Sequence, residues 1–252
     1  MKKILTEKFK KGFIPKKDPE PFSLKANRVL LEGLAGSGKT YFINRAIEKI
    51  LEDKNANTNF VLTNAHGDFS ELSSKLLDLS YKLFVLNSST EKKFVKIHKI
   101  DSTLSVSTYE SYDEEIWNSL MTEPKTAVVV NISNIGGKDL YSSLVTNCMN
   151  QLIAKDPLEG VNLITVFDDF EYMFGFDNLE KESNNKISRL IVELLEKYCD
   201  SDTEHFKIVF SGQCLLRISV FSKFFITKGT YQYINFSTDF QPMKKGSAIW
   251  EY

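Results

Sequence analysis

The sequence predicts an α/β fold in which a mostly parallel sheet of about seven strands carries helices on both faces. Two observations predict it. Short apolar runs alternate with amphipathic stretches along the whole chain, and a glycine-rich motif separates the first apolar run from the first amphipathic stretch. Short apolar strands joined by helices are typical of a parallel sheet that is covered on both sides.

The strands are expected where aliphatic and aromatic residues follow one another without interruption. These segments are residues 28–31, 60–62, 83–86, 127–132, 163–167, 207–210 and 231–236. Apolar residues at helical spacing predict helices over residues 41–51, 70–79, 112–121, 142–154, 187–198 and 215–221. The polar stretches 52–59 and 177–186 are expected to be surface loops.

Residues 33–40 spell G-L-A-G-S-G-K-T, which fits the phosphate-binding P-loop pattern G-x-x-x-x-G-K-T. Such a loop directs backbone N–H groups and a helix N-terminus at phosphate oxygens. Lys39 adds a positive charge, and the Thr40 hydroxyl is placed to ligate Mg²⁺. We therefore expect a P-loop NTPase that binds Mg-ATP. The binding residues would be Gly33, Leu34, Ala35, Gly36, Ser37, Gly38, Lys39, Thr40 and Tyr41.

Composition favours one sizeable domain, because the chain has 252 residues and 42% hydrophobic content. We expect a basic arm over residues 1–26, the ATPase domain over 27–240 and a tail over 241–252.

The net charge of -1 gives no global reason to expect nucleic acid, although the first 28 residues hold nine basic and three acidic side chains. Three isolated cysteines and the lack of a membrane-spanning run predict a cytoplasmic protein, or a nuclear one in a eukaryote.

Acidic residues follow the apolar run 163–167 and would complete the nucleotide site. Asp168 is expected to hold the Mg²⁺ side of the site, and Asp169 to act on the attacking water. Asp169 is one methylene shorter than glutamate, and Glu171 could compensate only if the backbone turns toward the site. After residues 207–210, Gln213 is the candidate to sense the γ-phosphate, with Ser211 second.

Several segments in order resemble the HerA–FtsK superfamily of DNA- and protein-pumping ATPases, including TraG/TraD-type coupling proteins. They are residues 60–69, 81–87 and 127–135, with Gln213 where that family carries a glutamine. The resemblance covers residues 26–240 and implies an oligomeric motor that acts on a polymer such as DNA. The chain departs from the family at Asn64, where an acid is expected, and at Asp169, which replaces glutamate. It also lacks the coupling proteins' membrane segments and has only residues 88–122 in place of their all-helical domain.

Three alternatives remain open. The chain also resembles AAA+ subunits of the origin-recognition or peroxisomal kind, although about 85 residues separate the P-loop helix from residues 127–132, where that fold would place a strand soon after the helix. A structural or regulatory protein that binds ATP without hydrolysing it would fit Asp169. A small-molecule kinase would share the P-loop.

In an oligomer, self- or hetero-assembled, Arg217 is the candidate to reach a neighbouring subunit's γ-phosphate.

Overall fold

The computed structural model describes residues 24, 26–53, 57–64, 69–88, 95–99, 102–105, 113–131, 138–157, 159–173, 185–199, 205–213, 215, 232–236 and 249–251. Their centre is one ten-stranded sheet with the order β10-β9-β1-β8-β7-β2-β6-β3-β4-β5. The strands are β1 (Arg28–Gly33), β2 (Thr58–Asn64), β3 (Lys82–Ser88), β4 (Val95–Lys99), β5 (Ser102–Ser105), β6 (Thr126–Asn131), β7 (Asn162–Phe167), β8 (Phe206–Gly212), β9 (Gln232–Phe236) and β10 (Ile249–Glu251).

Seven neighbouring strands, from β9 to β3, pair in parallel, which confirms the predicted sheet. All seven strands that the apolar runs predict are present. The additional strands lie at the two edges of the sheet and run antiparallel. β4 and β5 form a hairpin beside β3, and β10 pairs with β9.

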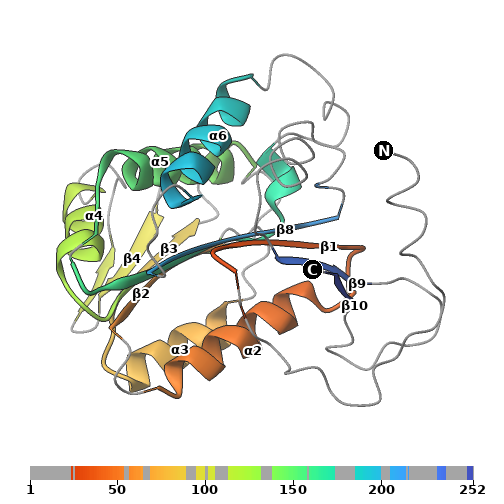
Figure 1. The fold of residues 1–252 in the computed structure, drawn as a ribbon. Coiled ribbons are helices and arrows are strands. Elements are labelled where there is room, and N and C mark those ends of the chain that lie inside the picture. Colours follow the sequence, from red (N-terminus) through yellow and green to blue (C-terminus); the bar gives the residue numbers. More distant parts are fainter. Residues whose placement is uncertain are drawn as a thin grey trace, which may run out of the picture.

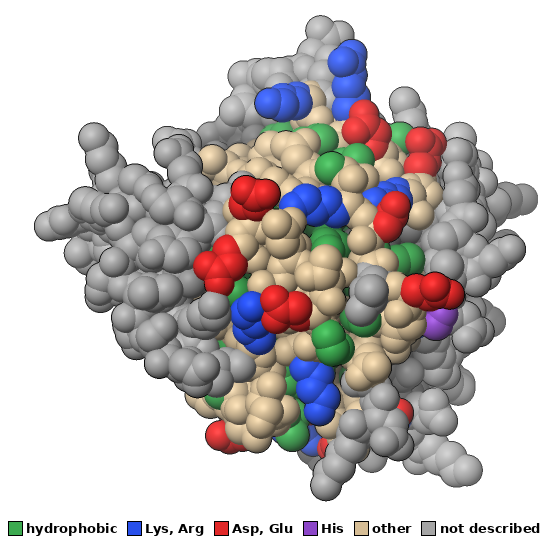
Figure 2. Space-filling view, turned by 90° about the vertical axis from the view of Figure 1, so that its left-hand side faces the viewer, with side chains coloured by type: hydrophobic (Ala, Val, Ile, Leu, Met, Phe, Trp, Pro, Cys, Tyr) green, Lys and Arg blue, Asp and Glu red, His purple; other side chains and the backbone are tan. Residues whose placement is uncertain are grey.

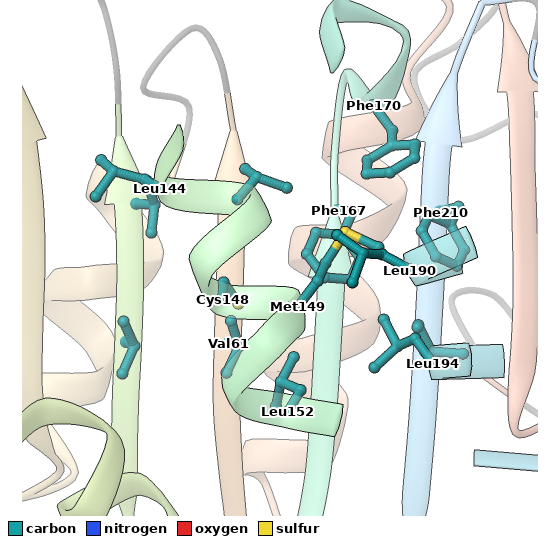
Figure 3. Close-up of a cluster of buried hydrophobic side chains, with 14 of the residues drawn as sticks. Val61, Leu144, Cys148, Met149, Leu152, Phe167, Phe170, Leu190, Leu194 and Phe210 are labelled. Atoms are coloured by element: carbon teal, nitrogen blue, oxygen red, sulfur yellow. The ribbon is translucent and has the colours of Figure 1, made fainter. Parts of the chain in front are cut away.

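Helices cover both faces of the sheet, as Figure 1 shows. One face carries α2 (Lys39–Leu51) and α3 (Ser70–Asp78), and the other carries α4 (Asp113–Thr122), α5 (Lys138–Ala154) and α6 (Asn185–Cys199). Each layer buries its own apolar cluster against the sheet. In the second layer, Cys148 of α5 lies over Val61 of β2, and Met149 lies over Phe167 of β7 (Figure 3). Burial of this kind drives folding and fixes which strand ends come together.

The polar stretch 52–59 is only partly a surface loop, because β2 already begins at Thr58. Thr58 and Asn59 are fully buried. The Asn59 amide nitrogen donates hydrogen bonds to the carbonyl oxygens of Leu120 and Glu123, at 2.7 and 2.8 Å, and its oxygen accepts the N–H of Thr126 at 2.8 Å. The side chain thereby satisfies three backbone groups between α4 and β6, which explains why a polar residue lies inside the sheet.

The sheet order gathers four strand ends that are far apart in the sequence. β1, which leads into the P-loop, pairs with β8; β8 pairs with β7, and β7 with β2. Because these strands are parallel, their carboxyl ends lie along one edge of the sheet. In open α/β sheets, ligands bind at this edge.

Candidate functional site

The P-loop connects β1 to α2 in a tight turn that only glycine accommodates at its start. A Cβ atom at Gly33 would lie 2.8 Å from the Phe236 Cβ and 2.7 Å from the Ser37 Oγ. Gly36 and Gly38 have φ angles of 75° and 101°, in the left-handed region that favours glycine. The sequence GLAGSGKT therefore supplies glycine where the backbone requires it.

The N-terminus of α2 has no side chain that caps it. Gly38 is its N-cap residue, and the first turn contains no acidic residue. Uncapped N–H groups at a helix start form an anion-binding site, to which the helix dipole contributes. The preceding loop is open to solvent, since Leu34 is 53% exposed, and Tyr41 in the first turn is 38% exposed. A phosphate can reach this loop from solvent.

Lys39 is only 6% exposed, and its ammonium group lies against the loop. Nζ donates hydrogen bonds to the carbonyl oxygens of Gly33 at 2.7 Å and of Leu34 at 3.1 Å. These two bonds leave one of its three N–H groups for a further acceptor. The charge is thus held beside the mouth of the loop.

Thr40 and Asp168, which are 128 positions apart in the sequence, are in direct contact. The Thr40 Oγ1 donates a hydrogen bond to the Asp168 Oδ2 at 2.7 Å. Asn64, at the end of β2, donates to the same carboxylate oxygen at 3.0 Å. The sheet therefore brings together the hydroxyl and the carboxylate that the sequence predicts for a magnesium site, with an amide beside them.

Asp168 is fully buried, and both of its backbone polar groups are hydrogen-bonded. Its N–H donates to the Thr63 carbonyl oxygen at 2.9 Å, and its carbonyl oxygen accepts the Tyr141 hydroxyl at 2.8 Å. Burial raises the pKa of Tyr141 well above its ordinary range, so the phenol stays a proton donor at neutral pH. Tyr141, on α5, thereby fixes the end of β7 from the opposite layer.

The backbone reverses direction at Asp169, which has a φ angle of 53°. The N–H of Tyr172 donates to the Asp169 carbonyl oxygen at 3.0 Å, and the short 3₁₀ helix η2 (Phe170–Met173) begins there. The Asp169 Oδ2 accepts a long hydrogen bond of 3.4 Å from Asn64. Its side chain is therefore directed toward the β2 side of Asp168.

Glu171, on η2, is turned back toward the site. This is the condition under which it could compensate for the short side chain of Asp169. Its side chain is fully buried, and its Oε1 accepts the N–H of Gln213 at 3.1 Å. Oε2 accepts no hydrogen bond from any described residue. Burial is the main cause that raises the pKa of Glu171. Its own backbone N–H, that of Gln213 and the charge of Lys39 oppose this shift, whereas the charge of Asp168 adds to it.

The donor set fits Mg-ATP. A hydroxyl and a carboxylate oxygen are hard ligands of the kind that Mg²⁺ prefers, and Mg²⁺ commonly takes one or two protein oxygens together with phosphate oxygens. The uncapped helix start and Lys39 suit the phosphates. The Ser37 Oγ, inside the loop, has no hydrogen-bond partner among the described residues and would gain one from a phosphate oxygen.

Three further residues were predicted to act on the γ-phosphate, and the structure describes two of them, Gln213 and Ser211. Gln213 directly follows β8, next to the end of β7, with Ser211 buried one residue inside the strand end. Arg217 lies outside the described residues, as does most of the predicted helix 215–221. Sequence reasoning missed Tyr141, whose only signal is its place on the buried face of α5. In the sequence, Asn64 stands out only as a departure from the HerA–FtsK pattern.

A shallow cavity of about 210 Å³ lies at the opposite edge of the sheet, away from these groups. It is lined by Ile50, Asp53, Thr58, Asn162, Ile164, His205 and Lys207. These residues sit at the amino ends of the strands and at the end of α2. Among the described residues, the groups predicted to bind the nucleotide therefore lie at the carboxyl edge and not in this hollow.

The raised pKa of Glu171 predicts how stability depends on pH. An acid whose pKa is raised by folding contributes its full stability below its ordinary pKa of 4.5, and that contribution is lost as pH rises through the raised value. Glu171→Gln removes this loss. We expect the variant's melting temperature, relative to wild type, to increase between pH 4.5 and pH 8 in nucleotide-free buffer. The exposed Glu193→Gln on α6 is the control, and an identical shift at both pH values would contradict the prediction.

Comparisons with known proteins assign neither a family nor a function to the chain. No protein-family model matches the chain, and no curated protein matches it. Among solved structures it is similar to a KaiC-like protein from the hyperthermophilic archaeon Pyrococcus horikoshii OT3, with 16% identity and a TM-score of 0.36 over 83% of this chain and 72% of that one. At this TM-score the similarity assigns neither activity nor ligand. Within the described residues, no helix is long and apolar enough to cross a membrane.

Proposed function

We propose that the chain binds Mg-ATP as a P-loop ATPase. The contact that carries the proposal is the 2.7 Å hydrogen bond from Thr40 to Asp168, because it joins the P-loop to the carboxylate at the end of β7. The N–H groups at the start of α2 and the Lys39 ammonium would bind the phosphates. Thr40 and Asp168 would hold Mg²⁺, whose charge stabilises the transferring phosphoryl group when it is bound.

We further propose that the chain acts as a subunit of an oligomer, and two families are candidates for its role. The HerA–FtsK resemblance favours a motor that moves a nucleic acid. The strand order removes the objection to the AAA+ alternative, because β2 directly follows the P-loop helix and pairs with β7. The extra strands β3 and β6 lie outside β2, so the long separation that counted against an AAA+ subunit becomes an extension of the sheet.

A nucleic-acid partner stays a prediction that rests on the basic N-terminal arm and the HerA–FtsK resemblance. On the face in Figure 2, acidic and basic side chains are interspersed among the described residues and are not gathered by sign. Two lysines are also paired with acids: Lys82 contacts Glu123 at 2.8 Å, and Lys197 contacts Asp156 at 2.9 Å. Contact with a polyanion would therefore depend on the arm more than on this face.

The test is a titration of the full chain with a fluorescent ATP analogue, in Mg²⁺ and then in EDTA, followed by steady-state ATPase with and without DNA. We expect saturable binding that Mg²⁺ strengthens. DNA-stimulated turnover supports the motor, turnover that only partner subunits stimulate supports the AAA+ subunit, and binding without turnover supports a structural or regulatory role. Failure to bind the analogue in Mg²⁺ contradicts the proposed function as a whole.

A further inference from the structure

Two carboxylates flank Asp168, and they lie on opposite sides of it. Asp169 contacts Asn64 at the end of β2. Glu171 contacts the end of β8, because its Oε1 accepts the Gln213 N–H. In the sheet order β1-β8-β7-β2, the P-loop strand pairs with β8 and is separated from β2 by two strands. Glu171 is therefore on the P-loop side of Asp168, and Asp169 is on the far side.

The backbone at the end of β7 produces this arrangement. The left-handed conformation of Asp169 and the hydrogen bond from Tyr172 to its carbonyl oxygen turn the chain into η2. Glu171 is thereby directed back over the edge of the sheet. The sequence predicts Asp169 as the residue that acts on water, whereas the turn places the longer side chain of Glu171 on the P-loop side of Asp168.

The space that Glu171 occupies exists because residue 212 is a glycine. A Cβ atom at Gly212 would lie 2.2 Å from the Glu171 Oε2, so any other residue would displace the carboxylate. Oε2 is buried and has no hydrogen-bond partner among the described residues. A buried carboxylate oxygen without a hydrogen-bond partner is costly, so this oxygen is suited to accept a hydrogen bond from a bound molecule. A bound water molecule could donate the missing hydrogen bond to Oε2.

We propose that Glu171, and not Asp169, is the general base that accepts the proton of the water attacking the γ-phosphate; this rests on the proposed ATPase function. The water oxygen bonds to the γ-phosphorus while the bond from that phosphorus to the β–γ bridging oxygen breaks. The electron pair of the broken bond leaves with ADP, and the water proton passes to the Glu171 carboxylate and then to solvent. The backbone N–H of Gln213 holds Oε1, which leaves Oε2 for the water.

Burial suits Glu171 to this task. A general base is most effective when its pKa lies near the working pH, and burial moves the pKa of this carboxyl upward in that direction. The Lys39 charge favours the ionised form that the step needs.

The experiment compares single-turnover ATP hydrolysis by the full chain and by three variants: Glu171→Gln, Asp169→Asn and the exposed Glu193→Gln. Glutamine keeps the acceptor for the Gln213 N–H and removes the base. We expect Glu171→Gln to slow hydrolysis by about 100-fold or more while Asp169→Asn slows it by less than about 10-fold. Binding of the fluorescent ATP analogue should stay within about threefold of wild type, as expected when only a transition-state interaction is lost. Glu193→Gln should match wild type.

The pH dependence of the single-turnover rate separates a base from a merely structural residue. Wild type should lose rate as pH falls through the pKa of Glu171, and Glu171→Gln should lack this acidic limb. Hydrolysis at the wild-type rate by Glu171→Gln, or a larger loss in Asp169→Asn, overturns the assignment. So does a wild-type chain that binds ATP and never releases phosphate, whereas a chain that binds no ATP overturns the proposed function itself.

Discussion

The Lys39→Ala variant should bind ATP about 10- to 100-fold more weakly than wild type, because a hydrogen bond from a charged donor contributes about 1.5–3 kcal/mol. Lys39 is the buried cation at the mouth of the P-loop, and its ammonium is already held in place by the carbonyl oxygens of Gly33 and Leu34. The Lys39 side chain therefore loses little conformational entropy when it binds a phosphate. Titration with a fluorescent ATP analogue measures the loss.

Lys49→Ala is the matched control for this prediction. Lys49 lies on the same helix, ten residues further along, and its side chain is exposed near the C-terminus of α2. Its removal should leave ATP affinity unchanged, since the charge is far from the phosphate-binding end. Equal losses in Lys39→Ala and Lys49→Ala would point to a general effect of net charge and would count against a phosphate site at the loop.

Phe170→Ala should destabilise the fold by about 3–5 kcal/mol, the usual cost of emptying a buried aromatic site. Phe170 is the first residue of η2 and is fully buried. Its ring packs edge-on against Phe210 with the centroids 4.9 Å apart, and lies 5.5 Å from Phe167 (Figure 3). Urea unfolding measures the loss of stability.

The same substitution should affect hydrolysis more than binding, because Phe170 anchors the turn that carries Glu171. The milder Phe170→Leu, which keeps the core largely filled, should still bind ATP and hydrolyse it more slowly than wild type. Phe84→Leu is the control, since Phe84 is buried on β3, with β6 and β2 between it and β7. If both leucine variants hydrolyse ATP equally fast, η2 does not depend on this contact for its position.

The sequence predicted the parallel core of the fold well because each of its strands is buried on both faces. Such strands must be apolar throughout, and apolar runs are visible in a sequence. β4, β5 and β10 carry no such signal. β4 reads Val-Lys-Ile-His-Lys and β10 has three residues, so their strand pairing comes from a neighbour and not from their own composition.

The sequence located the P-loop and Asp168 through motif and order, but it could not show how the second carboxylate is presented. Aspartate tolerates a left-handed backbone conformation without requiring it. Whether the chain turns at Asp169 therefore depends on η2 packing against the core. The prediction that Asn59 lies in a surface loop was wrong for a related reason. A buried asparagine is stable only where the tertiary structure supplies its hydrogen-bond partners, and these cannot be read from the local sequence.

The contact between Thr40 and Asp168 has a consequence for how a metal ion would enter. A hydroxyl group donates one proton and keeps two lone pairs, so Thr40 can retain its 2.7 Å bond to Asp168 while a lone pair turns to a cation. The entropy cost of bringing these two ligands together is therefore met when the protein folds and not when the ion binds.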